Sequence, residues 1–201
     1  HGTVGEDMEL VVRLHRRGIE TGKPNRIVFL PEPVCWTEVP ESLRILGRQR
    51  ARWHRGAIET FVRHGHMMVN PKYGRIGIIG MGQVLLFDLI GPVLEVVGYV
   101  LLPAMWMLGI LHFDYVLAFF SLSVLFGIAM SVGALAIEEA ELRRVGRVRD
   151  LLRLAAAAVL ENFGYRQINS FWRLRGLWEW FRGVKTWGEM TRKGFRHSAP
   201  K

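Results

Sequence analysis

The sequence predicts an α-helical membrane segment that follows the C-terminal end of a cytosolic α/β domain. The main observation is that residues 76–142 contain no Lys or Arg, while basic residues crowd both flanks. In addition, 50% of the 201 residues are hydrophobic although the net charge is +9, a combination that is unusual in a soluble protein that binds nucleic acid. Residues 1–75 would make a poor core by themselves and have the pattern of the closing elements of an α/β domain whose sheet lies upstream.

The chain begins at His1, and its first residues are typical of the middle of a domain. We therefore expect it to be the C-terminal part of a longer protein. A single Cys excludes an internal disulfide framework and a zinc site built from cysteines. The ample supply of apolar residues excludes global disorder.

Residues 1–75 are expected to hold two helices joined by an extended connector. The first helix is predicted over Glu6–Arg17, with acids at its start, arginines at its end and Gly18 as its stop. A short strand is expected at Arg26–Leu30, and the prolines after it favour an extended chain. Ser42 is placed to cap the second helix, which should run to about His64.

Residues 76–137 are expected to form a membrane hairpin. A helix needs about 20 apolar residues to cross a bilayer, and two such lengths occur here, Ile90–Leu111 and Tyr115–Ile137. Basic residues on both flanks predict that both ends lie in the cytoplasm. The alternative, a buried helical pair in a soluble protein, would require an unusually large partner surface to cover it.

Two features of this run leave alternatives open. The glycine-rich stretch Ile76–Leu89 either lies at the membrane interface or extends the first span, with Pro92 producing a kink or break. Asp88 and Glu95 are spaced to share a helix face, so they either face a protein interior or, for Asp88, lie at headgroup level in water.

Residues 138–201 are expected to form a cytosolic basic loop, an interfacial helix and a basic-aromatic tail. The apolar run Leu151–Phe163 is too short for an ordinary span, which favours an interfacial helix. After it, arginines alternate with tryptophans, a mixture that suits anionic lipid headgroups or single-stranded nucleic acid. Because a membrane hairpin precedes this tail, we expect lipid contact, a cytoplasmic tail and no nucleic-acid partner.

Three clusters in residues 1–75 carry candidate chemistry. Glu6 and Asp7 open a helix directly after a glycine, where a carboxylate can act as a general base or simply stabilise the helix end. The segment Gln49–Trp53 offers an amide, guanidinium groups suited to phosphate and a flat indole, although an amphipathic surface helix would look the same. The connector Trp36–Leu43 would set the position of that segment.

Taken in order, and followed by membrane helices, these clusters resemble the family-2 membrane glycosyltransferases. This group contains cellulose, hyaluronan, chitin and poly-N-acetylglucosamine synthases and many bacterial relatives, and the resemblance spans about residues 1–140. It implies that Asp7, with Glu6 beside it, is the catalytic base next to the acceptor. It also implies that Gln49, Arg52 and Trp53 form the family's Gln-x-x-Arg-Trp motif, which encloses Arg50. In that motif the indole is the floor for the acceptor sugar, and the polar members lie near the donor diphosphate and the acceptor.

The resemblance further implies an inverting transfer from a nucleotide sugar to a growing polysaccharide or a lipid-linked acceptor, at a multi-pass protein of the inner (plasma) membrane. The preceding α/β domain would be of the GT-A type. A divalent metal, Mg or Mn, is implied through an Asp-x-Asp upstream of the acid pair, and this chain contains neither that motif nor a plausible metal cluster. We therefore expect residues 1–201 alone to be inactive.

Three functions remain open from the sequence. The first is a processive synthase that exports its polymer, and the second is an enzyme that transfers a single sugar to a lipid. The third is a non-enzymatic membrane scaffold, in which Arg52 and Trp53 only seat the chain at the bilayer surface.

Overall fold

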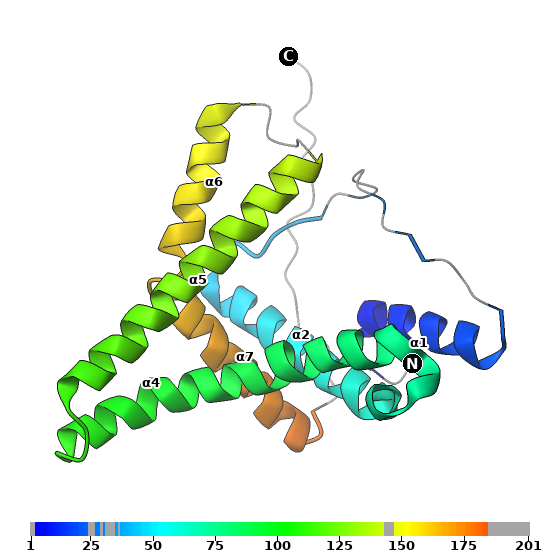
Figure 1. Cartoon of the computed structure of the whole chain (residues 1–201), viewed down its shortest axis with the longest axis horizontal. Coiled ribbons are helices and arrows are strands. Elements are labelled where there is room, and N and C mark those ends of the chain that lie inside the picture. Colours follow the sequence, from blue (N-terminus) through cyan, green and yellow to red (C-terminus); the bar gives the residue numbers. More distant parts are fainter. Residues whose placement is uncertain are drawn as a thin grey trace. The chain divides into compact units, whose positions relative to one another are not determined.

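The computed structural model describes residues 3–23, 27–28, 30, 35, 37–142 and 147–184, and every regular element in these ranges is helical (Figure 1). Of the strand expected at Arg26–Leu30, the described residues Ile27, Val28 and Leu30 form no strand. This expectation was wrong for them, because a strand requires a neighbouring strand to receive its backbone hydrogen bonds. The first prolines of the connector, Trp36, the centre of the basic loop and the tail beyond residue 184 lie outside the described residues.

The chain divides into two compact units, one of His1–Ile90 with Trp172–Lys201 and the other of Gly91–Phe171. The first unit begins with α1 (Glu6–Glu20). This helix continues through Gly18, where a stop was expected, because Gly18 is buried in the packed face of the helix. The left-handed residue that follows the helix is Gly22, at φ 65°.

The second helix of this unit, α2 (Leu43–His64), begins as predicted. Ser42 is its N-cap, and the backbone N–H of Ile45 donates to Ser42 Oγ at 3.3 Å. Two short elements follow it, α3 (His66–Val69) and the 3₁₀ turn η1 (Pro71–Tyr73). Their main function is to build the core of this unit. That core consists of Met67, Tyr73 and Met81, packed against Val12, Ile19, Phe61, Met68 and Ile76.

The chain then continues in π-helical geometry, first as η2 (Ile76–Met81) and then as η3 (Val84–Ile90). Both belong to one continuous helix, Ile76–Met107, which is long and apolar enough to cross a membrane, as is Phe113–Ala140. The glycine-rich stretch therefore extends the first long helix. Pro92 lies in the first turn after the π-helical part, where a residue without an N–H fits the change in backbone hydrogen bonding.

The second unit contains α4 (Gly91–Met107) and α5 (Phe113–Leu142), which form a hairpin in Figure 1. It also contains α6 (Val148–Leu160), close to the expected interfacial helix, and the first part of α7 (Tyr165–Phe181). Glycine allows tight packing in the hairpin, because a side chain on Gly98 of α4 would collide with the ring of Phe119 of α5.

A polar cluster lies inside the second unit, around the carboxylate of Glu95. This carboxylate accepts hydrogen bonds from Arg166 Nε at 2.8 Å, Ser170 Oγ at 2.6 Å and the Tyr99 hydroxyl at 2.7 Å. In the first unit, Asp88 pairs with Arg173 at 2.7 Å. Both acids of the long apolar helix thus have an arginine partner.

Candidate functional site

The N-terminus of α1 meets α2 through two glycines that touch backbone to backbone. A Cβ added to Gly56 would lie 2.6 Å from the Cα of Gly5, closer than two carbon atoms can approach. Beside this contact, the backbone N–H of Val4 donates to Glu59 Oε2 at 2.9 Å. The chain that leads into the acid pair is therefore fixed to α2 one helical turn after Trp53.

The acid pair itself is exposed. Glu6 and Asp7 lie in the first turn of α1, and Asp7 Oδ1 accepts the backbone N–H of Met8 at 2.8 Å. The N-cap of this helix is Gly5, which has no side chain to cap it. Acidic groups here are favoured by the helix dipole, and the carboxylate of Asp7 is open to solvent.

The segment Gln49–Trp53 lies within α2, as predicted, with its members in different surroundings. Trp53 is 50% exposed, and the guanidinium of Arg50 stacks over its indole at 4.9 Å from the ring centroid. Arg52 is buried, with 8% of its surface exposed, and Gln49 is half-buried. A half-exposed indole oriented by a cation is a suitable platform for the apolar face of a sugar ring.

The other side of α2 is held by α7, a contact that the sequence analysis did not predict. A side chain on Gly47 would strike the indole of Trp172 at 2.7 Å, and one on Gly176 would strike the carbonyl of Ala51. An ion pair between Arg55 of α2 and Glu179 of α7, 3.3 Å long, continues the same contact. One sequence feature could have predicted a close contact on this side of α2. Gly47 and Ala51 of α2 are four positions apart, and small residues at this spacing allow two helix backbones to approach closely.

A buried polar pair also joins α1 to α2. Nε2 of His64 lies 3.3 Å from Glu9 Oε1, and its Nδ1 lies 3.5 Å from Arg16. The neutral tautomer with its proton on Nε2 satisfies both contacts, and burial lowers the pKa of His64. Burial alone would raise the pKa of Glu9, but the His64 hydrogen bond and the charges of Arg13 and Arg63 together keep it below its usual value.

Within the described ranges, no group of three or more His, Cys, Asp or Glu side chains is placed to hold a metal ion. Two of the histidines, His54 and His64, are instead buried between helices, at 3% and 2% exposed surface. The burial of His54 and His64 between helices does not fit an accessible divalent-cation site.

Comparison with known proteins identifies the family of the chain. The sequence profile described as glycosyl transferase family group 2 matches residues 1–137. The sequence is 32% identical to the poly-beta-1,6-N-acetyl-D-glucosamine synthases of Staphylococcus aureus strains COL, MRSA252 and N315. The aligned region has 82 residues, which is 41% of this chain but only 18% of the length of each synthase. No solved structure matches the chain. The contact between the acid-headed helix and the Gln49–Trp53 helix thus lies inside the matched region, and the chain belongs to glycosyl transferase family group 2.

Proposed function

We propose that the chain forms the acceptor side of an inverting membrane glycosyltransferase. The observation that carries this proposal is the contact between Gly5 and Gly56. It brings the acid pair to α2 within one turn of Trp53. A base, a sugar platform and guanidinium groups then belong to two helices that are packed on each other.

In the proposed reaction, an acceptor hydroxyl attacks the anomeric carbon of a nucleotide sugar. The carboxylate of Asp7 takes the hydroxyl proton as the new C–O bond forms. The bond from the anomeric carbon to the diphosphate breaks on the opposite face, and its electron pair leaves with the diphosphate. Trp53 orients the acceptor ring, and the arginines of α2 supply positive charge for the leaving group.

The nucleotide-binding part and the divalent cation belong, in this proposal, to residues of the whole enzyme outside this chain. The two long apolar helices anchor the enzyme in the membrane. We favour a polysaccharide as the product, because the relatives that match are synthases of a poly-N-acetylglucosamine. The membrane helices would then lie where a growing polymer leaves the acceptor site.

The decisive experiment replaces Asp7 by Asn in the full-length enzyme and follows turnover of the nucleotide sugar in membranes. Asp7→Asn keeps the size of the side chain but removes the base, so transfer should fall by about 10²-fold or more. Asp114→Asn, an exposed acid at the start of α5, is the matched control and should keep full activity. Full turnover by Asp7→Asn would overturn the assignment of the base.

Product analysis and one further variant separate the remaining functions. Long polymer supports the synthase, whereas a glycolipid with a single added sugar would replace it by a lipid glycosyltransferase. Trp53→Ala should raise KM for the acceptor, because the sugar platform is lost. If Trp53→Ala shifts membrane partitioning and leaves transfer unchanged, the indole is only a membrane anchor.

A further inference from the structure

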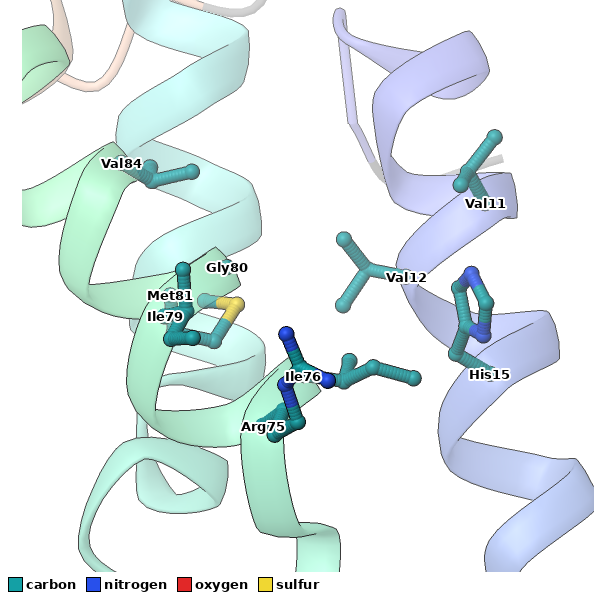
Figure 2. Close-up of a pocket in the computed structure, with 9 residues that line it drawn as sticks. All are labelled: Val11, Val12, His15, Arg75, Ile76, Ile79, Gly80, Met81 and Val84. Carbon is teal, nitrogen blue, oxygen red and sulfur yellow. The ribbon is translucent and has the colours of Figure 1, made fainter. Parts of the chain in front are cut away.

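A groove in the first unit lies between α1 and the start of the long apolar helix. Its volume is about 420 Å³, within the range of roughly 300–1,000 Å³ that is typical of ligand sites. Figure 2 shows its two walls, with Val12 pointing from α1 toward the facing helix and Ile76 pointing back toward α1. The lining residues that matter here are Val12 and His15 of α1 and Arg75, Ile76, Ile79 and Gly80 of the facing segment.

The chemistry of this lining is apolar with a basic edge. Aliphatic side chains, a methionine and a glycine make most of the wall, and no acid is among the lining residues. Arg75 and His15 supply the polar groups, and the Arg75 side chain is exposed. An elongated apolar ligand with an anionic head group matches an apolar wall beside the exposed guanidinium of Arg75.

The position of the groove along the sequence further restricts which class of ligand it can bind. Arg75 is the last basic residue before a stretch that contains no Lys or Arg until after Leu142, and the first candidate membrane span begins at Ile76. A residue in that position lies at headgroup depth, since basic side chains flank the hydrocarbon core. The wall formed by Ile76, Ile79 and Gly80 then faces the outer part of the acyl chains.

We propose that this groove binds one acyl chain of an anionic phospholipid, with the lipid phosphate paired to Arg75. This inference rests on the membrane insertion contained in the proposed function. The lipid connects α1, which carries Asp7, to the membrane helix at the level where that helix leaves the cytoplasm. Its presence links the geometry of the acceptor side to the charge of the surrounding bilayer.

Gly80 is the position chosen to obstruct the groove. Gly80 lines the groove, and a Cβ on it meets no atom within 4 Å, so we expect a Leu side chain at this position to occupy groove volume without a clash at its Cβ. Gly82 has the same open surroundings but does not line the groove, so Gly82→Leu is the matched control. For charge, Arg75→Gln is compared with Lys72→Gln, an exposed basic residue outside the groove.

The experiment uses the full-length protein in nanodiscs of phosphatidylcholine with phosphatidylglycerol that carries a photoreactive acyl chain. After irradiation, labelled residues are located by peptide mass spectrometry. We expect labelling of Val12 in the wild type, a roughly tenfold decrease in Gly80→Leu from displacement of about two methylenes, and no change in Gly82→Leu. Arg75→Gln should lose the preference for labelled phosphatidylglycerol over labelled phosphatidylcholine, and Lys72→Gln should retain it.

An internal reference separates this inference from the proposed function. Leu122 and Leu125 of α5 are exposed and lie in the second candidate span, so they report bilayer insertion directly. Labelling of α5 without labelling of Val12 overturns the lipid groove and leaves membrane insertion standing, as expected if another protein segment fills the groove. Equal labelling of Val12 in Gly80→Leu and Gly82→Leu also overturns it. Absence of labelling at both places overturns membrane insertion itself, and the groove proposal with it.

Discussion

Gly5 and Gly56 touch backbone to backbone, and this contact decides where the acid-headed helix meets the helix of Trp53. Either residue with a side chain would force the two backbones apart, because a Cβ on Gly5 would lie 2.8 Å from the Cα of Gly56. The relief cannot come from a rotamer change, since both partners are main chain. The position of Asp7 therefore depends on two residues that carry no functional group.

We predict that Gly56→Ala destabilises the enzyme by about 1–3 kcal/mol and lowers sugar transfer. The added methyl group pushes the start of α1 away from α2, so Asp7 loses its position. The thermal unfolding midpoint in detergent and turnover of the nucleotide sugar would measure both effects. Gly82→Ala, which has open space around it, should change neither.

Glu59 should act as a positioning residue for Val4 and Gly5, which lead into α1. Glu59→Ala removes the acceptor of the Val4 N–H, a hydrogen bond that contributes about 1 kcal/mol to stability. We expect kcat to fall while KM for the donor stays constant, because the change acts on the placement of Asp7. Glu59→Gln keeps an acceptor oxygen and should restore kcat. If Ala and Gln reduce kcat equally, the carboxylate charge matters and the positioning role is wrong.

A pH dependence of stability should follow from His54. Burial, aided by the nearby charge of Arg173, lowers the pKa of His54 to about 4. The unfolded chain, with a pKa near 6.5, binds a proton that the folded protein excludes, so stability is lost as the pH falls from 6.5 toward 4. At pH 5 the loss should be about 2 kcal/mol relative to pH 7.5.

The measurement is the unfolding midpoint in detergent at pH 7.5 and pH 5.0. His54→Leu should lose less stability between these pH values than the wild type. His66→Leu changes an exposed histidine and should keep the wild-type dependence. An identical decrease in the wild type and His54→Leu would show that another group titrates.

The polar cluster of the second unit predicts a strong coupling between Glu95 and Arg166. Glu95→Gln and Arg166→Gln should each destabilise the protein, and the double variant should be more stable than the sum of their effects predicts, by between about 0.5 and 3 kcal/mol. The reason is that each single variant leaves a charge in the packed helices. The exposed pair Asp150–Arg153 of α6 is the control, and its coupling should stay below about 0.5 kcal/mol. Additive effects at Glu95 and Arg166 would contradict the prediction.

The elements that sequence could predict are those whose signal is local. Ser42 as a cap and the start of α2 follow from side-chain chemistry within a few residues. The two long apolar helices follow from the absence of charge over a continuous run. Gly18 misled the prediction of the end of α1, because the helix continues through this buried glycine despite its low helix propensity.

The candidate site also has a part with a local sequence signal and a part without one. The acid pair and the Gln49–Trp53 segment are visible as types of residue in order, but the contact that joins them is made by Gly5 and Gly56, which are inconspicuous in a chain with 22 glycines. The packing of α7 against α2 joins residues more than a hundred positions apart. Contacts between residues so far apart depend on the complete fold, and the partner cannot be predicted from a local sequence pattern.

The packing of α7 on α2 also determines where the protein can be shortened. A stop codon before Trp172 would uncover the peptide groups of Gly47 and Ala51 and leave the guanidinium of Arg55 without its partner on Glu179. The resulting polypeptide would be prone to aggregation during expression, and its inactivity would be mistaken for a catalytic requirement. Truncated variants should therefore end after Val184, so that α7 remains packed against α2, the helix that carries Trp53.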